Sequence, residues 1–208
     1  MNEKDTLNRL KIQERETRKS LILDAAKRVF SNKSYDKANM REIADEAGIA
    51  TSSIYTYFPN QEALFVEAAI REVCILREYI QEMAKECATD DKRLESFINT
   101  FIEYIAKHES YFRMMVVFMT HGNLHEESLE KLNMSVREIF DYTDDIFRGL
   151  SCPGDVRKIS HYLFSVLNGI LVTYRKLPGR SEEELIAHMK ELGAIMKNTI
   201  VNMRMVGA

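Results

Sequence analysis

The sequence predicts an all-α protein made of two helical parts. Apolar side chains recur at helical spacing along nearly the whole chain of 208 residues, of which 45% are apolar. The only prolines are Pro59, Pro153 and Pro178, and each lies between two such segments. No internal repeat and no low-complexity segment is present. A chain of this length and composition can bury a sizeable core.

The first helix is predicted by an apolar stripe that ends at residue 30. The stripe consists of Leu21, Ile22, Ala25, Ala26, Val29 and Phe30, an i, i+1, i+4, i+5 pattern. The preceding 20 residues are mostly charged or polar and include Arg9, Lys11, Arg15, Arg18 and Lys19 diluted by acids. We expect most of this tail to be frayed and solvated; the alternative is that its cations touch the DNA backbone.

Residues 40–58 predict two short helices joined by a sharp turn. Apolar residues recur at helical spacing up to Ala47, and Gly48 follows where a helix end needs a residue tolerant of positive φ. In the second helix, which runs from residue 50 or 51, Ile54 and Phe58 share one side. The polar residues between them then face outward, as in a helix-turn-helix whose second helix lies in the DNA major groove. An ordinary helical hairpin inside a bundle has the same spacing.

Six longer helices are predicted in the rest of the chain. The expected ranges are 61–84, a helix that restarts after residues 89–91 and carries the apolar residues from Leu94 to Ile105, 109–120, 126–150, 155–176 and from Ser181 onward. The segment 109–120 is apolar nearly all round, which is typical of a helix surrounded by others. Ser181 precedes three glutamates, a start that suits both helix capping and the helix dipole.

A set of residues around the two short helices carries a family resemblance. The set comprises Phe30, Arg41, Ile43, Ala44, Ala47-Gly48-Ile49, Ile54-Tyr55, Tyr57-Phe58, Glu62, Leu64 and Phe65. It resembles the TetR family of bacterial transcriptional regulators, and it is specific as a set although no single motif is. The resemblance implies a helix-turn-helix DNA-binding domain with its charged tail over residues 1–60. It implies a larger helical ligand-binding and dimerisation domain over residues 61–208.

The resemblance also implies which residues contact DNA. Arg41 matches a position that often contacts a base or a phosphate, and its fork can pair with guanine. Positions 51–53 match contacts at the mouth of the groove, and positions 55 and 57 match phosphate contacts. For Tyr55, packing alone is the alternative role. The expected DNA-binding residues are Lys37, Arg41, Thr51, Ser52, Ser53, Tyr55 and Tyr57.

Three positions depart from the family pattern. Many members have glycine or proline where this chain has Ser52, and often serine where it has Ala50. Because alanine cannot cap a helix through its side chain, we expect Thr51 or Ser52 to provide the cap. The position of Gln61 is commonly lysine, so the absence of a charge there puts one phosphate contact in doubt.

The second part of the chain is expected to hold an effector and to form a homodimer. The resemblance implies a pocket for a small, hydrophobic molecule; for each candidate residue, core packing is the alternative. The candidates are Phe101, Tyr104, Met115, Phe118, Met119, Phe140, Phe164 and Asn168. The last two helices have wide apolar faces, and Gly169 would allow close approach of backbones. Pairs of these helices from two chains would make a four-helix bundle, whereas a monomer would bury them internally.

Charge and cysteine content fit a cytoplasmic protein without a membrane partner. The net charge is −3, with +2 on residues 1–60 and −5 on residues 61–208, the sign expected for a DNA-binding head. The amino terminus lacks the apolar run of a signal peptide, and the longest apolar run, 114–119, is too short to cross a bilayer. Cys74, Cys87 and Cys152 show neither metal spacing nor a disulfide framework.

Enzymatic chemistry and metal binding are not expected. The chain contains no glycine-rich phosphate loop, no nucleophile elbow and no helical carboxylate pair suited to acid–base catalysis, and no cofactor is implied. His121 and His125 are four apart, a spacing that metal ligands use on a helix. Gly122 and Asn123 between them predict a surface loop instead.

Two functions therefore remain. The first is a ligand-responsive transcriptional regulator, most simply a repressor, that binds a palindromic double-stranded operator as a homodimer and is released by an effector. The second is an all-helical small-molecule-binding protein without operator binding.

Overall fold

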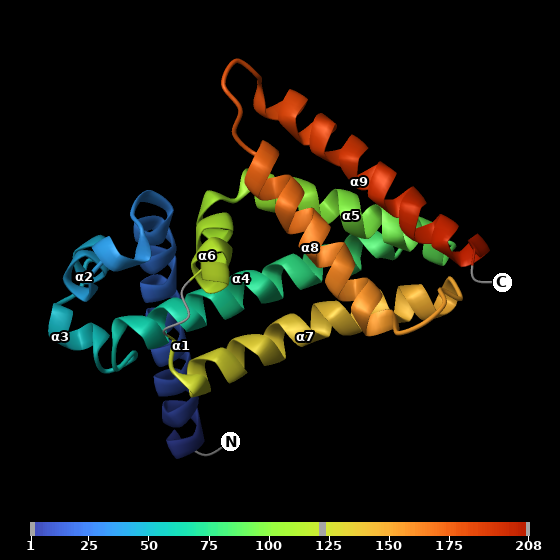
Figure 1. The fold of residues 1–208 in the computed structure, drawn as a ribbon. Helices are drawn as coiled ribbons and strands as arrows, with labels where there is room; N and C mark the ends of the chain where they lie inside the picture. The colour runs from blue at the N-terminus through green and yellow to red at the C-terminus, as the bar shows by residue number, and fades with distance from the viewer. Residues whose placement is uncertain (1–2, 121–123, 207–208) are drawn as a thin grey trace. The chain divides into compact units, whose positions relative to one another are not determined.

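The computed structural model describes residues 3–120 and 124–206, without the side chains of residues 3, 4, 118, 120 and 203–206. All regular structure in these residues is helical, which confirms the predicted fold class. The elements are α1 (Glu3–Asn32), the 3-10 turn η1 (Tyr35–Lys37), α2 (Met40–Ala47), α3 (Thr51–Ile54), α4 (Gln61–Ala84), α5 (Asp90–Lys107), α6 (Glu109–Thr120), α7 (Glu126–Gly149), α8 (Val156–Tyr174) and α9 (Glu182–Val206) (Figure 1).

The chain divides into two compact units. The first comprises residues 1–72 and 110–132, and the second comprises residues 73–109 and 133–208. Helices α4 and α7 each contribute residues to both units.

The long helices have the predicted bounds to within a few residues, since their ends carry recognisable caps. Helix α4 and helix α6 coincide with the ranges expected from the sequence. At the start of α9, the Ser181 N–H donates to a Glu184 carboxylate oxygen (2.9 Å), and the Glu184 N–H donates to Ser181 Oγ (3.2 Å). The cap that Ser181 predicts is therefore present, and the bond from the Ser181 N–H to Glu184 extends it to a reciprocal capping box.

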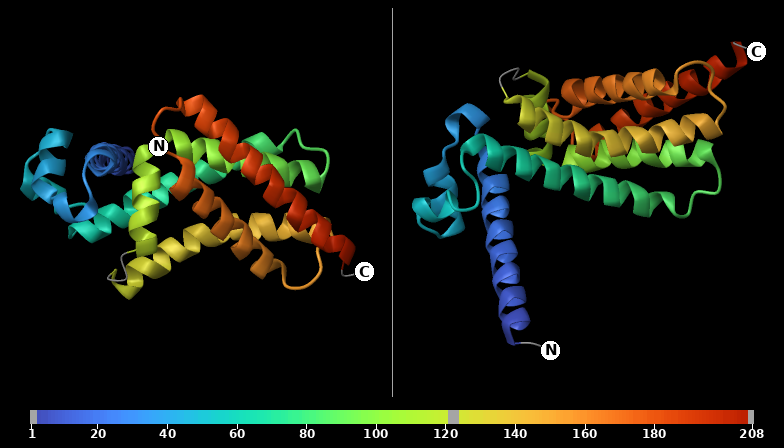
Figure 2. Two further views of the ribbon diagram at one scale, coloured as in Figure 1. Left: turned by 45° about the horizontal axis from the view of Figure 1, so that its top comes forward. Right: turned by 90° about the horizontal axis from the view of Figure 1, so that it is seen from below.

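The expectation of a frayed tail is wrong. Helix α1 begins at Glu3 and continues without a break to Asn32, so its amino-terminal half runs beyond α2 and α3 as an exposed rod (Figure 2). No glycine or proline occurs before Gly48, and Glu, Lys, Arg and Leu are good helix formers. An i, i+4 pair between Glu14 and Arg18 (2.7 Å) adds local support.

Helix α3 is shorter than predicted. It ends at Ile54 instead of Phe58, and residues 55–57 form turns, although the Phe58 N–H still donates to the Ile54 carbonyl (3.0 Å). After Ile54 the backbone N–H groups of Thr56 and Tyr57 donate three residues back, to the carbonyls of Ser53 and Ile54, so the segment continues as turns and not as α-helix. Pro59 disfavours the helical conformation at Phe58. Ala50 occupies the N-cap position with no side-chain cap bond, so the expected cap from Thr51 or Ser52 is absent.

The first unit is built on the packing of α2 against α1, with α3 beside α2 (Figure 1). Aromatic rings join this group to the start of α4: the ring centroids of Phe30 and Phe65 lie 5.1 Å apart, and those of Tyr35 and Phe65 lie 4.7 Å apart. The fully buried residues of this core are Ile22, Ala25, Ala26, Phe30, Ile43, Ala44, Ile54, Phe58, Leu64 and Phe65.

Ion pairs fasten α1 to α4 within the first unit. Lys19 pairs with Glu67 (3.0 Å), Arg71 with Asp24 (2.6 Å) and Lys27 with Glu72 (2.8 Å). The Glu72 side chain is buried, so the Lys27 ammonium supplies the compensating charge that a buried carboxylate requires.

In the second unit α9 packs against both α5 and α8. The close approach of α5 and α9 depends on Gly193, where an added Cβ would lie 2.6 Å from Ile98 Cγ2. Lys190 of α9 pairs with Glu103 of α5 (2.6 Å). Between α7 and α8, Ser160 Oγ donates to the buried Asp144 carboxylate (2.6 Å).

Candidate functional site

The geometry of the helix pair follows from the two ends of α2. The Asn39 side chain accepts a hydrogen bond from the Glu42 N–H (3.0 Å) and caps the start of the helix. Gly48 ends it in the left-handed region, with φ 68° and ψ 30°. The chain therefore reverses sharply and delivers α3 beside α2, as predicted from the glycine.

The polar face of the α3 segment is partly, not uniformly, exposed. Ser52, Ser53 and Tyr55 are exposed, with Tyr55 at 51%. Thr51 and Tyr57 are half-buried, and the Arg15 guanidinium of α1 lies 5.6 Å from the Tyr57 ring centroid. This distance is within cation–π range.

Arg41 and Lys37 lie beside this face with exposed side chains. Arg41 is the second residue of α2, and Lys37 ends η1 just before it. Neither side chain makes an ion pair within the part of the chain that the structure describes. Two cations are thus available next to exposed serine and tyrosine hydroxyls, a combination suited to phosphate oxygens and base edges.

Gln61, the residue where many family members have lysine, takes part in an internal hydrogen bond. Its Nε2 donates to the Tyr35 carbonyl (2.8 Å) and so ties the start of α4 to η1. The side chain is half-buried. Its amide therefore stabilises the loop that carries Lys37.

Glu62, next along α4, connects to the start of α7. Its carboxylate accepts from the His125 N–H (2.9 Å) and lies 2.7 Å from His125 Nδ1. Burial acts to raise the pKa of Glu62, but hydrogen bonds from Ser128 and His125 outweigh it and hold that pKa below its usual value. His125 thus contacts the Glu62 carboxylate. His121, which was considered with His125 as a metal ligand, lies outside the described residues.

Four predicted effector residues lie near one another in the second unit. Phe101 of α5 and Phe140 of α7 both contact Phe164 of α8, with ring centroids 5.4 Å and 4.5 Å apart. Asn168 follows Phe164 by one helical turn, and its Oδ1 is buried with no hydrogen-bond partner among the described residues. The structure therefore brings three aromatic rings and one amide together, through helices far apart in the sequence.

Three of the other predicted effector residues have side chains that the structure describes. Tyr104 stacks on His108, with ring centroids 3.9 Å apart. Met115 and Met119 belong to α6 and hence to the first unit; Met115 is half-buried and Met119 is exposed. The side chain of Phe118 lies outside the described residues.

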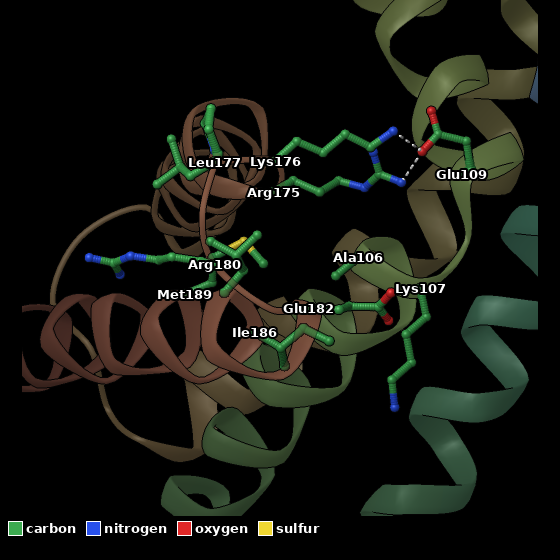
Figure 3. Close-up of a pocket in the computed structure, with 12 residues that line it drawn as sticks. Ala106, Lys107, Glu109, Arg175, Lys176, Leu177, Arg180, Glu182, Ile186 and Met189 are labelled. Carbon is green, nitrogen blue, oxygen red and sulfur yellow. Dashed lines mark hydrogen bonds and ion pairs between the residues drawn. The ribbon is translucent and has the colours of Figure 1, made fainter.

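A cavity of about 600 Å³ lies at the corner of α5, α8 and α9 (Figure 3). Apolar side chains from Ala106, Ile186 and Met189 form one part of its lining. Opposite them, Arg175 and Lys176 both pair with Glu109, at 3.0 Å for Lys176. The sequence analysis did not single out these residues, although the basic residues that flank the Leu177-Pro178-Gly179 turn were a visible signal.

No group of three His, Cys, Asp or Glu side chains able to hold a metal occurs among the described residues. Cys74, Cys87 and Cys152 form no disulfide within the part of the chain that the structure describes. None of the helices described is long and apolar enough to cross a membrane.

Comparison with known proteins decides the family. Residues 22–68, which span part of α1 through the start of α4, match the family model of bacterial regulatory proteins of the tetR family. Residues 22–68 thus belong to a domain of the TetR family. Because the matching family consists of regulatory proteins, the match agrees with the expectation that the chain is not an enzyme.

A curated relative supports this TetR assignment. An uncharacterized HTH-type transcriptional regulator of Haemophilus influenzae is 28% identical over 105 residues, which cover 50% of this chain and 51% of the relative. The chain thus matches about half the length of that protein.

Two solved structures share the TetR-family fold over most of the chain. One is the transcriptional regulator FadR from Bacillus subtilis in complex with stearoyl-CoA, with a TM-score of 0.74 at 23% identity. The match covers 88% of this chain and 98% of the FadR chain. The other is AibR in complex with isovaleryl coenzyme A and operator DNA, with a TM-score of 0.67 at 19% identity. The match covers 84% of this chain and 97% of the AibR chain. At these identities the likeness concerns the fold.

Proposed function

We propose that this TetR-family protein is a ligand-responsive transcriptional repressor that binds a palindromic operator as a homodimer in the cytoplasm. The observation that carries the proposal is the exposed polar face of α2 and α3 on a packed helical core. Lys37 and Arg41 flank the serines and Tyr55 on this face without ion pairs among the described residues.

The contacts divide into two kinds. Arg41 is proposed to reach a base edge or a phosphate, since its planar fork pairs with either. Lys37, Tyr55 and Tyr57 are proposed to hold phosphates and thereby set the register of the protein on the duplex. Thr51, Ser52 and Ser53 are proposed to contact bases or phosphates at the mouth of the groove. These contacts suit DNA because they combine charge with hydroxyl donors.

A homodimer explains how four residues of α3 suffice for specific binding. We propose that α8 and α9 of two chains form a four-helix bundle around a twofold axis. Two recognition segments then reach successive major grooves about 34 Å apart, and the operator becomes an inverted repeat. Exposed apolar side chains on both helices support this arrangement: Tyr162, Val172 and Ile195.

The effector is proposed to be a small hydrophobic molecule that binds in the second part of the chain. The cluster of Phe101, Phe140 and Phe164 with the buried amide oxygen of Asn168 supports an apolar ligand with one hydrogen-bond donor. The acyl chains of the thioesters named for FadR and AibR are hydrophobic groups of this kind, although the coenzyme A to which they are joined is charged. Tyr104, Met115, Phe118 and Met119 remain predicted lining residues.

Release of DNA is proposed to run through α4. Three ion pairs, made by Lys19, Asp24 and Lys27 of α1, fasten the first half of α4 to α1. A tilt of α4 must therefore move the helix-turn-helix domain that α1 belongs to. A ligand that prefers a different arrangement of the sensor helices then misplaces the recognition segments. A coupling free energy of about 1–3 kcal/mol suffices to change DNA affinity substantially.

Selection of bound duplexes from a random pool at defined salt tests the proposal. Recovery of an inverted repeat is expected, and failure to retain any duplex, with or without hydrophobic thioesters, would favour the alternative of a ligand-binding protein without operator binding. Arg41→Ala should relax the choice of base at one or two positions, whereas Lys37→Gln should weaken binding to all sequences alike. An unchanged selected sequence with Arg41→Ala would refute its base contact.

A further inference from the structure

The amino-terminal half of α1 carries a strip of cations along one side. Lys11, Arg15 and Lys19 are four residues apart, and Arg18 follows Arg15 by three, so all four lie within about 100° of the helix circumference. Asp5 and Glu16 fall outside this arc by the same geometry. We call these four residues the basic face of α1.

Acidic neighbours compensate only part of the basic face. Arg18 pairs with Glu14 (2.7 Å) and Lys19 pairs with Glu67 (3.0 Å). Lys11 and Arg15 are exposed and make no ion pair with any residue that the structure describes. Two uncompensated charges therefore remain, one helical turn apart.

The position of Arg15 places the basic face at the edge of the proposed DNA surface. Its guanidinium lies over the ring of Tyr57, and the Lys19 ammonium lies 5.9 Å from the ring centroid of Phe58. Tyr57 is itself a proposed phosphate contact. With a rise of about 1.5 Å per residue, Lys11 lies about 6 Å further along the rod.

A straight helix with unpaired cations suits the DNA backbone better than the base edges. A duplex carries one negative charge per about 1.7 Å of its axis, so a strip of this length meets more than one phosphate. Lys and Arg stems that project from an exposed helix can adjust to phosphates without reading sequence. Of the exposed apolar residues nearby, Leu10 lies about 100° from Lys11, whereas Leu7, one turn before Lys11, borders the basic face.

We infer that the basic face of α1 is a second, sequence-independent contact with the DNA backbone, made chiefly by Lys11 and Arg15. The inference rests on the proposed DNA binding and extends its surface beyond the helix-turn-helix. The cation–π contact with Tyr57 orients Arg15, so the recognition segment and the amino-terminal half of α1 engage the same duplex.

The salt dependence of operator affinity tests this inference. Removing one cation that neutralises a phosphate makes the slope of log K against log salt shallower by about 0.9. Each subunit of the proposed homodimer carries both cations, so Lys11→Gln/Arg15→Gln removes four of them from the complex. The slope should therefore fall by about 2 to 4, and binding should weaken about 100-fold or more near 0.1 M salt. The sequence recovered by selection should stay the same.

Two control variants separate charge from structure. Arg9→Gln removes an exposed cation of the same helix about 120° away from Arg15 and should leave the slope unchanged. Lys11→Arg/Arg15→Lys keeps both charges and should retain the wild-type slope, although it alters the stacking on Tyr57. Circular dichroism should give equal helicity for all variants.

The outcomes distinguish this inference from the proposed function. If wild type binds its operator and Lys11→Gln/Arg15→Gln has the same slope as Arg9→Gln, the second contact does not exist, and the helix-turn-helix contact stands. A weaker affinity with an unchanged slope would likewise overturn the inference, because it would indicate disturbed packing of Tyr57. A wild type that binds no duplex overturns both.

Discussion

Glu103 lies on α5 between two lysines, one on its own helix and one on α9. Its carboxylate accepts from Lys107 Nζ (2.6 Å), one turn later, and from Lys190 Nζ (2.6 Å). These two hydrogen bonds, Lys107 first, lower the pKa of Glu103 from its ordinary 4.5 to about 2. Because the folded state holds this carboxylate charged, it contributes stability that depends on pH.

Replacing Glu103 with Gln should lower the free energy of unfolding by about 1 kcal/mol at pH 7. The Glu103 side chain is 34% exposed, so solvent screens its ion pairs with the two lysines. The loss of stability therefore stays well below the free energy that corresponds to the full difference in pKa. Since the folded pKa is lowered, the contribution is complete above about pH 4.5 and is lost as the pH falls toward about 2. Urea unfolding of both proteins at pH 7, 5 and 3 measures it.

The matched control for this prediction is Glu191→Gln. Glu191 is an exposed carboxylate on α9, and its replacement should change stability by less than about 0.5 kcal/mol at any of these pH values. A difference between wild type and Glu103→Gln that stays constant from pH 7 to pH 3 would contradict the assigned role of the carboxylate.

At the scale of elements, two glycines in the last two helices have different surroundings. Gly169 of α8 is exposed, and an added Cβ would meet no atom within 4 Å. Gly193 of α9 is buried against α5, where an added Cβ would meet Ile98 at 2.6 Å and Ile102 at 3.1 Å. Close approach of helix backbones within one chain therefore occurs at Gly193, while Gly169 remains open to a second chain.

Gly193→Ala should destabilise the protein by about 1–3 kcal/mol, because the methyl group overpacks the contact between α9 and α5. In an Ile98→Ala background, the same substitution should be neutral or should stabilise by up to about 1 kcal/mol, since space is available and alanine favours the helix. The double-mutant cycle is measured by chemical denaturation. Equal effects in both backgrounds would show that Ile98 does not limit the packing.

At the scale of the whole molecule, the proposed dimer depends on the outer sides of α8 and α9. Tyr162 and Val172 of α8 and Ile195 of α9 expose 44%, 58% and 63% of their surface, which is unusual for side chains of this size. A second chain would remove them from water, and Gly169 between Tyr162 and Val172 would let the helices approach.

Val172→Asp should convert the dimer to monomers, because a buried interface cannot accommodate an unpaired carboxylate. Light scattering after gel filtration should then give the mass of one chain instead of two. Operator affinity should fall by about 100-fold or more, since the two half-sites are no longer bound by one linked assembly. Met134→Asp, at an exposed apolar residue of α7, should leave mass and affinity unchanged. A monomeric wild type would refute the dimer itself.

Sequence patterns determined most of the local structure. The stripe that ends at Phe30, the glycine at position 48 and the serine at position 181 predicted a helix, a left-handed helix end and a serine cap, and all three are present. These features depend on the backbone preferences of a few neighbouring residues, so they can be read without a tertiary structure. The full extent of α1 did not follow from its apolar stripe, because the charged residues before Leu21 form helix through their own propensity and not through packing.

Tertiary structure alone decided which distant residues meet. Three contacts join separate elements of the chain: the Phe101–Phe140–Phe164 cluster, the hydrogen bond from Gln61 to Tyr35 and the cation–π contact of Arg15 with Tyr57. Helical spacing gives the side of a helix on which a residue lies, but not the helix that this side will meet. That partner is selected by the packing of whole apolar faces, an interaction between segments far apart in the chain.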